Sequence, residues 1–259
     1  MRRFLIQLQF NGKRYGGWQK NDNTTSVAGV VEQALYKLFG SEIKAEGCSR
    51  TDAGVSAEQY FFHFDADTKL PAERVCYKLD RFLPPDVQAQ SSVEVDAAFH
   101  ARKNVLAKTY EYRFYCGEHI LPLINRDAYY AGRVLDEENM HSVCRVFEGR
   151  HDFSAFRTES SSRSSPEKTV MSVRLDRADG VYRLRLTADG FLYNMARIMA
   201  GAVVAAGQNK LTAQNIADAL CDGIRPPSIV TLPPKALVLK RVYYDETAMR
   251  SSFDKTFVL

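Results

Sequence analysis

The chain has 259 residues, of which 45% are hydrophobic and 25% are charged, which is ordinary for a globular protein of one large or two moderate domains. No apolar run is long enough to cross a bilayer, so we expect no membrane partner and a cytoplasmic location. The five cysteines are scattered without the close spacing of zinc or redox motifs, which predicts free thiols and no bound metal. A net charge of +4 permits a polyanionic partner but does not indicate one.

The first half of the sequence predicts a strand, a helix, two strands, a helix and a strand. Apolar residues alternate in the first strand, and Gln7 and Gln9 interrupt the run, which argues against a leader peptide. Gly40 ends the first helix, whose apolar residues recur at helical spacing. We expect these elements at residues 4–10, 27–39, 43–48, 58–64, 71–82 and 87–95.

The second half repeats much of this order. Asp136 is a good N-cap for the first helix, and Asp179-Gly180 is a strong hairpin signal between two strands. A polar stretch over 160–166 is typical of a mobile binding loop. We expect a strand at 106–116, a helix at 137–147, the hairpin, a helix at 191–206, a helix from Thr212 and a strand at 237–243.

Strand–helix–strand–strand–helix–strand is the ferredoxin-like pattern. We therefore predict an α+β fold of two ferredoxin-like halves that share an extended antiparallel sheet, with the active-site cleft at the seam. The predicted domains are 1–98, 99–247 and a tail over 248–259.

Basic residues gather in two places, which modestly favours a phosphate-binding groove over merely solvated surface. The two clusters are His100, Arg102, Lys103 and Lys108, and then Arg145, Arg150, His151, Arg157, Arg163 and Lys168.

Asp52 is the first candidate for chemistry. It precedes Ala53-Gly54 between two predicted strands, so the simplest interpretation is a carboxylate that stabilises its own turn. A catalytic role would require a constrained, accessible loop and a nearby cation to keep the carboxylate ionised. The residues alone leave both interpretations open.

The sequence resembles the tRNA pseudouridine synthase A family from about residue 4 to residue 243. Six ordered blocks carry the resemblance, which makes chance similarity very improbable. They are FNG at 10–12 with YGGWQ at 15–19, GCSRTDAGVSA at 47–57, FHAR at 99–102, KTYEY at 108–112, DFSAF at 152–156 and GFLYNMARIMAG at 190–201.

The resemblance implies roles for individual residues. Asp52 matches the nucleophile, Tyr110 the tyrosine that stacks on the target base, and Arg197 the arginine that pairs with the nucleophile. Arg50 matches a residue that fills the space left by the flipped nucleotide. Thr51, Arg102 and Phe191 are further candidate substrate contacts, and Trp18 is expected to support a substrate loop.

Without the resemblance, Tyr110 would be read as a core residue and Arg197 as a side chain that extends to solvent.

The resemblance also implies a reaction and partners. The expected enzyme isomerises uridine to pseudouridine in the anticodon arm of tRNA, at positions 38 to 40, as a homodimer without cofactor or metal. A carboxylate could attack the ribose C1′ or the uracil C6, or promote a glycal route, and the sequence does not choose among these.

The sequence departs from the family pattern at Ser56, where His is common, at Cys48-Ser49, at Lys103 and at Ala236. These changes question the target more than the reaction, so a paralogue acting on another RNA uridine is an alternative. A non-catalytic RNA-binding protein on the same fold is a second one. A glycosidase or phosphotransferase is disfavoured, because no second carboxylate motif and no glycine-rich phosphate loop is present.

Overall fold

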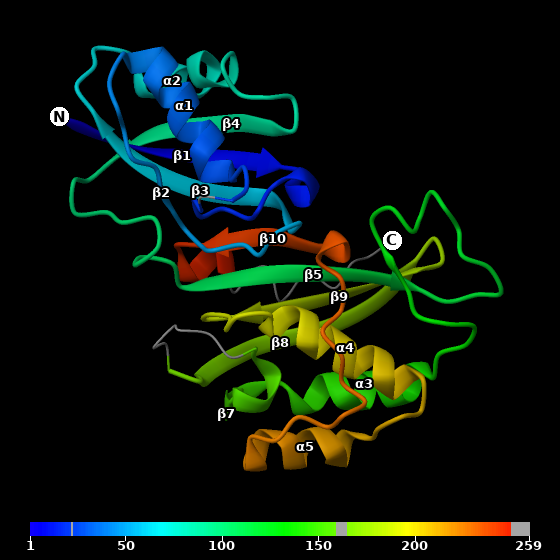
Figure 1. Ribbon diagram of the computed structural model, residues 1–259. Helices are drawn as coiled ribbons and strands as arrows, with labels where there is room; N and C mark the ends of the chain where they lie inside the picture. Colours follow the sequence, from blue (N-terminus) through cyan, green and yellow to red (C-terminus); the bar gives the residue numbers. More distant parts are fainter. Residues whose placement is uncertain (22, 159–164, 250–259) are drawn as a thin grey trace. The chain divides into compact units, whose positions relative to one another are not determined.

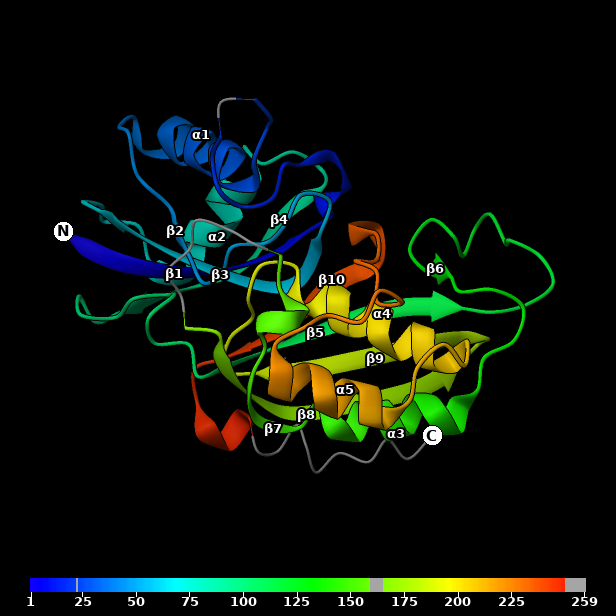
Figure 2. The ribbon, with the colours of Figure 1, turned by 60° about the horizontal axis from the view of Figure 1, so that its bottom comes forward.

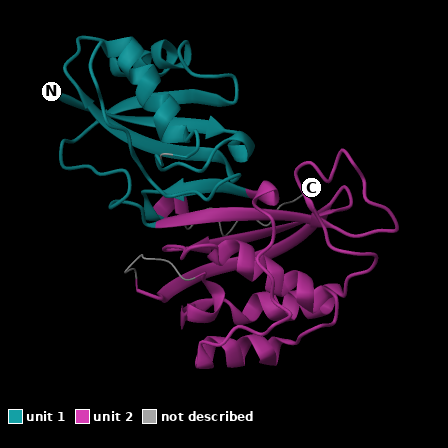
Figure 3. Ribbon diagram, viewed as in Figure 1, with its two compact units in different colours: residues 1–106, 238–246 teal, residues 107–237, 247–259 magenta. Residues whose placement is uncertain are grey.

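The computed structural model describes residues 1–21, 23–158 and 165–249, which form two compact units (Figure 3). Unit 1 contains residues 1–106 and 238–246. Unit 2 contains residues 107–237 and, among the described residues, 247–249. The expected domain limits of 98 and 247 stay a prediction. The last strand of the chain belongs to unit 1, because residues 238–246 contact mainly that unit.

Unit 1 is a sheet with two helices; Figure 1 draws residues 1–106 in blue to green and the last strand of this sheet in orange to red. The strands lie in the order β4-β1-β3-β10, and β2 pairs with β3. The pairs of β1 with β3 and β4 are antiparallel, whereas β10 runs parallel to β3. The elements are β1 (Arg2–Phe10), α1 (Val27–Phe39), β2 (Glu46–Gly47), β3 (Ser56–Ala66), α2 (Ala72–Asp80), β4 (Val87–Val95) and β10 (Leu237–Tyr243), with a short 3-10 turn at Gly12–Arg14.

The core of unit 1 lies between this sheet and its helices. Alternate residues of β1 are buried, and α1 buries one stripe of its surface, as amphipathic elements do. Ser26 caps α1 by accepting the Gly29 N–H at 3.1 Å, and Gly40 ends the helix in a left-handed conformation at φ 72°. The largest fully buried side chains here are Phe4, Ile6, Leu8, Tyr60, Phe62 and Phe64.

Unit 2 has the strand order β5-β9-β8-β7, antiparallel throughout, with β6 paired parallel to β5. Helix α3 packs on α4, α5 packs on α3, and the three helices gather on one side of the strands (Figure 2). The elements are β5 (Ala107–Tyr115), β6 (Tyr129–Tyr130), α3 (Glu137–Val146), β7 (Gly149–Asp152), β8 (Glu167–Ala178), β9 (Val181–Ala188), α4 (Met195–Gly207) and α5 (Ala213–Asp222), with 3-10 turns at Ser154–Phe156 and Pro234–Ala236.

Most expected elements are confirmed, and three expectations need correction. The strand expected at 43–48 is only Glu46–Gly47. The helix expected from 191 begins at Met195, because Asn194 adopts a left-handed conformation at φ 63° that cannot continue a helix. The expectation of a wholly antiparallel sheet is wrong, since β10 and β6 both pair in parallel and the sheet is mixed. The ferredoxin-like description of each half stays a prediction.

The expected mobile loop at 160–166 and the tail at 248–259 fall largely outside the described residues. Within the described ranges, no helix combines the length and apolar character that spanning a bilayer requires.

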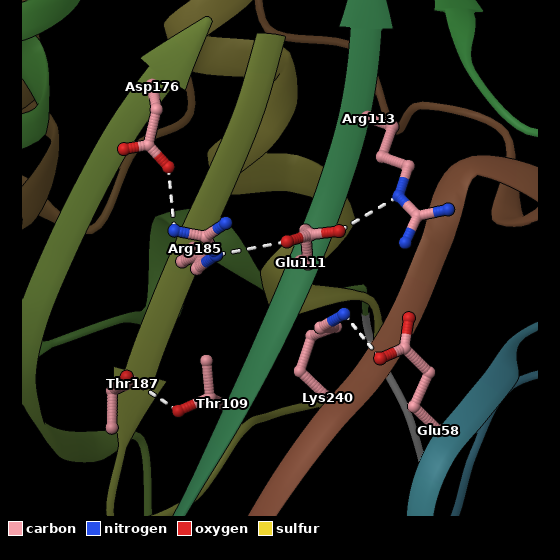
Figure 4. Close-up of polar contacts among 8 residues, drawn as sticks. All are labelled: Glu58, Thr109, Glu111, Arg113, Asp176, Arg185, Thr187 and Lys240. Atoms are coloured by element: carbon pink, nitrogen blue, oxygen red, sulfur yellow. Dashed lines mark hydrogen bonds and ion pairs between the residues drawn. The ribbon is translucent and has the colours of Figure 1, made fainter. Parts of the chain in front are cut away.

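A buried carboxylate links neighbouring strands of the unit 2 sheet (Figure 4). Glu111 on β5 is 1% exposed, and its two oxygens accept hydrogen bonds from the Nε atoms of Arg113 at 2.8 Å and Arg185 at 3.0 Å. Arg185 also donates to Asp176 on β8 at 2.6 Å, so the chain of charges links three strands. A buried carboxylate is tolerated because both its oxygens are paired.

Replacing Glu111 with Gln is expected to lower the free energy of unfolding by about 1–3 kcal/mol, because one of the two acceptor oxygens becomes an NH2 group that donates toward a guanidinium group. Urea denaturation measures this value. The matched control is Glu58→Gln, which breaks the more exposed pair with Lys240 in unit 1 and should cost less than about 1 kcal/mol. Equal losses in the two variants would contradict the account.

Candidate functional site

The Asp52 loop is a tight turn between β2 and β3. The Val55 N–H donates to the Asp52 carbonyl oxygen at 3.2 Å, and Gly54 adopts φ 82°, so the expected turn is present. The side chain of Asp52 is half-buried, and Arg50 is exposed. The turn therefore presents Asp52 on a constrained segment, which is the geometry that a nucleophilic carboxylate requires.

The segment after β1 holds this turn from one side. The Gly54 N–H donates to the Tyr15 carbonyl oxygen at 3.1 Å, and the Gly12 N–H donates to Ser56 Oγ at 3.0 Å. Gly17 lies so close that a Cβ on it would stand 2.3 Å from the Thr51 carbonyl oxygen. Glycine is required there because no side chain fits between the two backbones.

Two stacked aromatic residues pack against the backbone just before the Asp52 turn. Trp18 and Tyr60 stack with ring centroids 4.4 Å apart, and the Tyr60 hydroxyl donates to the Ser49 carbonyl oxygen. A Cβ on Gly47 would lie 2.5 Å from the Trp18 ring, so this part of the backbone rests directly on the indole. Trp18 is 5% exposed and acts as an anchor beneath the loop.

Thr51 and Arg102 occupy contrasting positions. Thr51 is 7% exposed, and its hydroxyl finds no hydrogen-bond partner among the described residues. Arg102 lies on the surface of unit 1. Their expected roles as substrate contacts stay predictions.

Tyr110 and Phe191 meet in unit 2. Tyr110 points from β5 and is 5% exposed, and its ring meets that of Phe191 edge to face, with centroids 5.0 Å apart and planes at 82°. Phe191 lies in the loop before α4, not on the helix. The contact fixes the plane of the Tyr110 ring.

Arg197 lies in the first turn of α4. Its Nε donates to the Leu232 carbonyl oxygen at 2.6 Å, and its Nη1 donates to Asn194 Oδ1 at 2.6 Å. Nearby, the Tyr112 hydroxyl donates to the Pro233 carbonyl oxygen at 2.9 Å. Burial raises the pKa of Tyr112 well above its usual range, and the positive charge of Arg197 offsets only part of that rise, so Tyr112 is a neutral donor here.

The sequence-based interpretation expected Trp18 to support a loop, but it missed Asn194 and the contacts that Tyr15 and Gly17 make with the Asp52 loop. Asn194 stands at the N-cap of α4 with a left-handed backbone, which Asn tolerates better than most residues. Asn194 lay inside the helix expected from residue 191, so no local pattern marked it as the residue before the helix. The role of Tyr15 and Gly17 depends on contacts between segments far apart in the sequence, which local patterns do not encode.

Several basic residues of the second cluster make local contacts. Arg150 pairs with Glu167 at 2.8 Å, and Lys168 donates to the carbonyl oxygens of Ser165 and Glu167 at 2.8 and 3.0 Å. Arg163 lies outside the described residues, so the phosphate-binding groove stays a prediction. In the part of the chain that the structure describes, no three His, Cys, Asp or Glu side chains gather as a metal site.

The family model and the curated relatives indicate one family. A family model described as tRNA pseudouridine synthase matches residues 143–245. Proteins named tRNA pseudouridine synthase A from Acetivibrio thermocellus and Clostridium botulinum are 36% and 33% identical over 244 residues, covering 94% of this chain and 100% of each relative. The protein of that name from Caldicellulosiruptor bescii is 34% identical over the same length.

Among solved structures, a chain of a Cbf5-Nop10-Gar1 complex aligns with a TM-score of 0.38 and 11% identity, covering 93% of this chain and 60% of that one. This similarity is too low to support an argument. The full-length relatives decide the assignment: the chain belongs to the tRNA pseudouridine synthase A family and is an RNA pseudouridine synthase, an isomerase.

Proposed function

We propose that this enzyme converts uridine to pseudouridine in the anticodon arm of tRNA, at positions 38 to 40, with Asp52 as the nucleophile. The observation that carries the proposal is the Asp52 turn, which is held by the glycine segment at one side and by the Trp18–Tyr60 stack below. A turn fixed on two sides can present a carboxylate without reorganisation. The tRNA substrate follows from the names of the relatives.

In the proposed reaction the glycosidic N1–C1′ bond breaks, the detached uracil turns, and a C5–C1′ bond forms; the proton on C5 leaves, and N1 takes up a proton. Asp52 would attack C1′, add to C6, or assist the elimination to a glycal; a carboxylate serves all three routes. The reaction is an isomerisation with no net oxidation or added group, and we propose that it uses no cofactor.

The target base must first leave its stack, which costs a few kcal/mol. Stacking on an aromatic ring recovers about 1–3 kcal/mol, and we assign this role to Tyr110, whose ring plane Phe191 fixes. The Tyr110 hydroxyl is also a candidate for proton transfer.

Arg197 is proposed to keep Asp52 ionised. A guanidinium stays protonated throughout the physiological range, and a charge-assisted pair lowers the pKa of a neighbouring carboxyl. Arg50 is assigned to the space left by the flipped nucleotide, which its exposed position permits. Thr51, Arg102 and Phe191 complete the proposed substrate contacts. We further propose a cytoplasmic homodimer.

The departures from the family pattern bear on the choice of uridine. Ser56 Oγ accepts the Gly12 N–H at 3.0 Å, so this side chain ties the loop to the segment after β1. Ser56, which stands where His is common in the family, therefore still anchors the loop that carries Asp52. An alternative is a paralogue that uses the same chemistry on another RNA uridine.

The test uses tRNA transcripts labelled with tritium at C5 of uridine. Release of tritium is expected from a transcript with uridine at positions 38 to 40, and it should be lost when these are replaced by cytidine. Undiminished release from the cytidine transcript would identify another target. Tight binding without any release from either transcript would favour the non-catalytic RNA-binding alternative for this chain.

A further inference from the structure

Asn194 departs from what its position predicts. As the N-cap of α4, its side chain would ordinarily accept a backbone N–H of the first turn, yet it makes no such bond. Instead, Asn194 Oδ1 accepts from Arg197 Nη1 at 2.6 Å, and Asn194 Nδ2 donates to Thr158 Oγ1 at 2.9 Å. The amide therefore joins the guanidinium of Arg197 to a second segment of unit 2.

Thr158 is itself held in place. Its N–H donates to the Tyr193 carbonyl oxygen at 3.1 Å. The residues just before it are fixed by Arg225, which donates to the carbonyl oxygens of Ala155, at 2.7 Å, and Arg157. Thr158 is thus a fixed point against which the Asn194 amide is oriented.

Arg197 also makes a contact with the backbone. Its Nε donates to the Leu232 carbonyl oxygen at 2.6 Å, and the Leu232 N–H returns a bond to the Arg197 carbonyl oxygen at 3.5 Å. An arginine side chain has several freely rotating bonds, so two acceptors on different nitrogens are needed to set the direction of its planar group. Of the two acceptors described here, one is backbone and the other is Asn194.

Asn suits this position for two separate reasons. A left-handed backbone at φ 63° is tolerated by Asn at little cost. A single amide also supplies one acceptor and one donor, which a carboxylate or a hydrophobic side chain does not. Gly would keep the backbone conformation and lose both bonds.

We propose that Asn194 is a positioning residue that orients the Arg197 guanidinium for catalysis, with Thr158 as its fixed support. The inference rests on the proposed role of Arg197. Misplacing a charged group by about 1 Å can cost roughly 10²-fold in rate, so the expected effect is on turnover and not on tRNA binding.

The test compares single-turnover rates and tRNA affinity for Asn194→Gly, Arg197→Lys and the double variant. Asn194→Gly should lower the rate by roughly 10- to 100-fold with tRNA affinity and thermal midpoint nearly unchanged. In the Arg197→Lys background the same change should have little further effect, because the guanidinium it orients is gone. Additive losses would indicate a general structural role and overturn the proposal.

Two matched controls sharpen the result. Asn209→Gly alters an exposed Asn with the same left-handed backbone, φ 55°, at the other end of α4, and should leave the rate unchanged. Thr158→Val should lower the rate, whereas Thr158→Ser, which keeps the hydroxyl, should restore it.

The outcomes separate the two proposals. If Arg197→Lys retains full activity, the assigned role of Arg197 fails and the positioning role with it. If Arg197→Lys is impaired while Asn194→Gly is not, only the positioning role is overturned.

Discussion

Asp52→Asn is expected to reduce pseudouridine formation by roughly 10⁴-fold or more, about 5 kcal/mol of transition-state stabilisation. The amide has the size of the carboxylate but neither its charge nor its nucleophilicity, so each proposed chemical route loses its essential group. Binding of tRNA should persist, because loss of a negative charge does not weaken attraction to phosphates. Tritium release under single-turnover conditions and a filter-binding assay measure the two quantities separately.

Asp67→Asn is the matched control for this prediction. Asp67 is an exposed residue of unit 1, beyond the end of β3, and its replacement makes the same change in net charge. The control should retain the wild-type rate. Substantial activity in Asp52→Asn, or an equal loss in both variants, would overturn the assignment of the nucleophile.

Local patterns in the sequence predicted most of the helices and strands. Helix α1 and strand β4 have the expected limits, and Gly40 ends α1 as the sequence predicted. Helix α4 was misplaced at its start because the run from Phe191 has helical spacing, and only the backbone of Asn194 shows that the first residues form a loop. The parallel pairing of β10 with β3 depends on residues far apart in the chain.

The candidate site also combines features that the sequence predicts with contacts that only the structure shows. The turn at Asp52 follows from Ala53-Gly54, which is a local signal. Its candidacy as a nucleophile came from the ordered blocks of the family, because the turn alone also suits a structural aspartate. The sequence could not reveal that Phe191 fixes the Tyr110 ring or that Asn194 contacts Arg197, since both depend on where α4 begins.

Gly17, which lies beside the loop that carries Asp52, is the site of the second substitution with a large expected effect on stability. Gly17→Ala should lower the free energy of unfolding by roughly 2–6 kcal/mol, from a strained backbone at φ 90° and from a methyl group placed 2.3 Å from the Thr51 carbonyl oxygen. Gly17 cannot easily retreat, because its own carbonyl oxygen accepts the Val27 N–H at 3.0 Å at the start of α1. The strain should therefore displace the loop that carries Asp52. The molecules that remain folded should then form pseudouridine more slowly than the wild type.

Gly40→Ala separates the cost of the strained backbone from the cost of the contact with Thr51. Gly40 has a similar backbone, φ 72°, but a Cβ there would meet nothing within 4 Å. This control measures the conformational cost alone, about 1–2 kcal/mol, and should leave the rate of pseudouridine formation intact. Urea denaturation and single-turnover rates on both variants give the comparison. Because the difference between them isolates the contact of Gly17 with Thr51, equal stability losses and equal rates would mean that this contact does not hold the Asp52 loop.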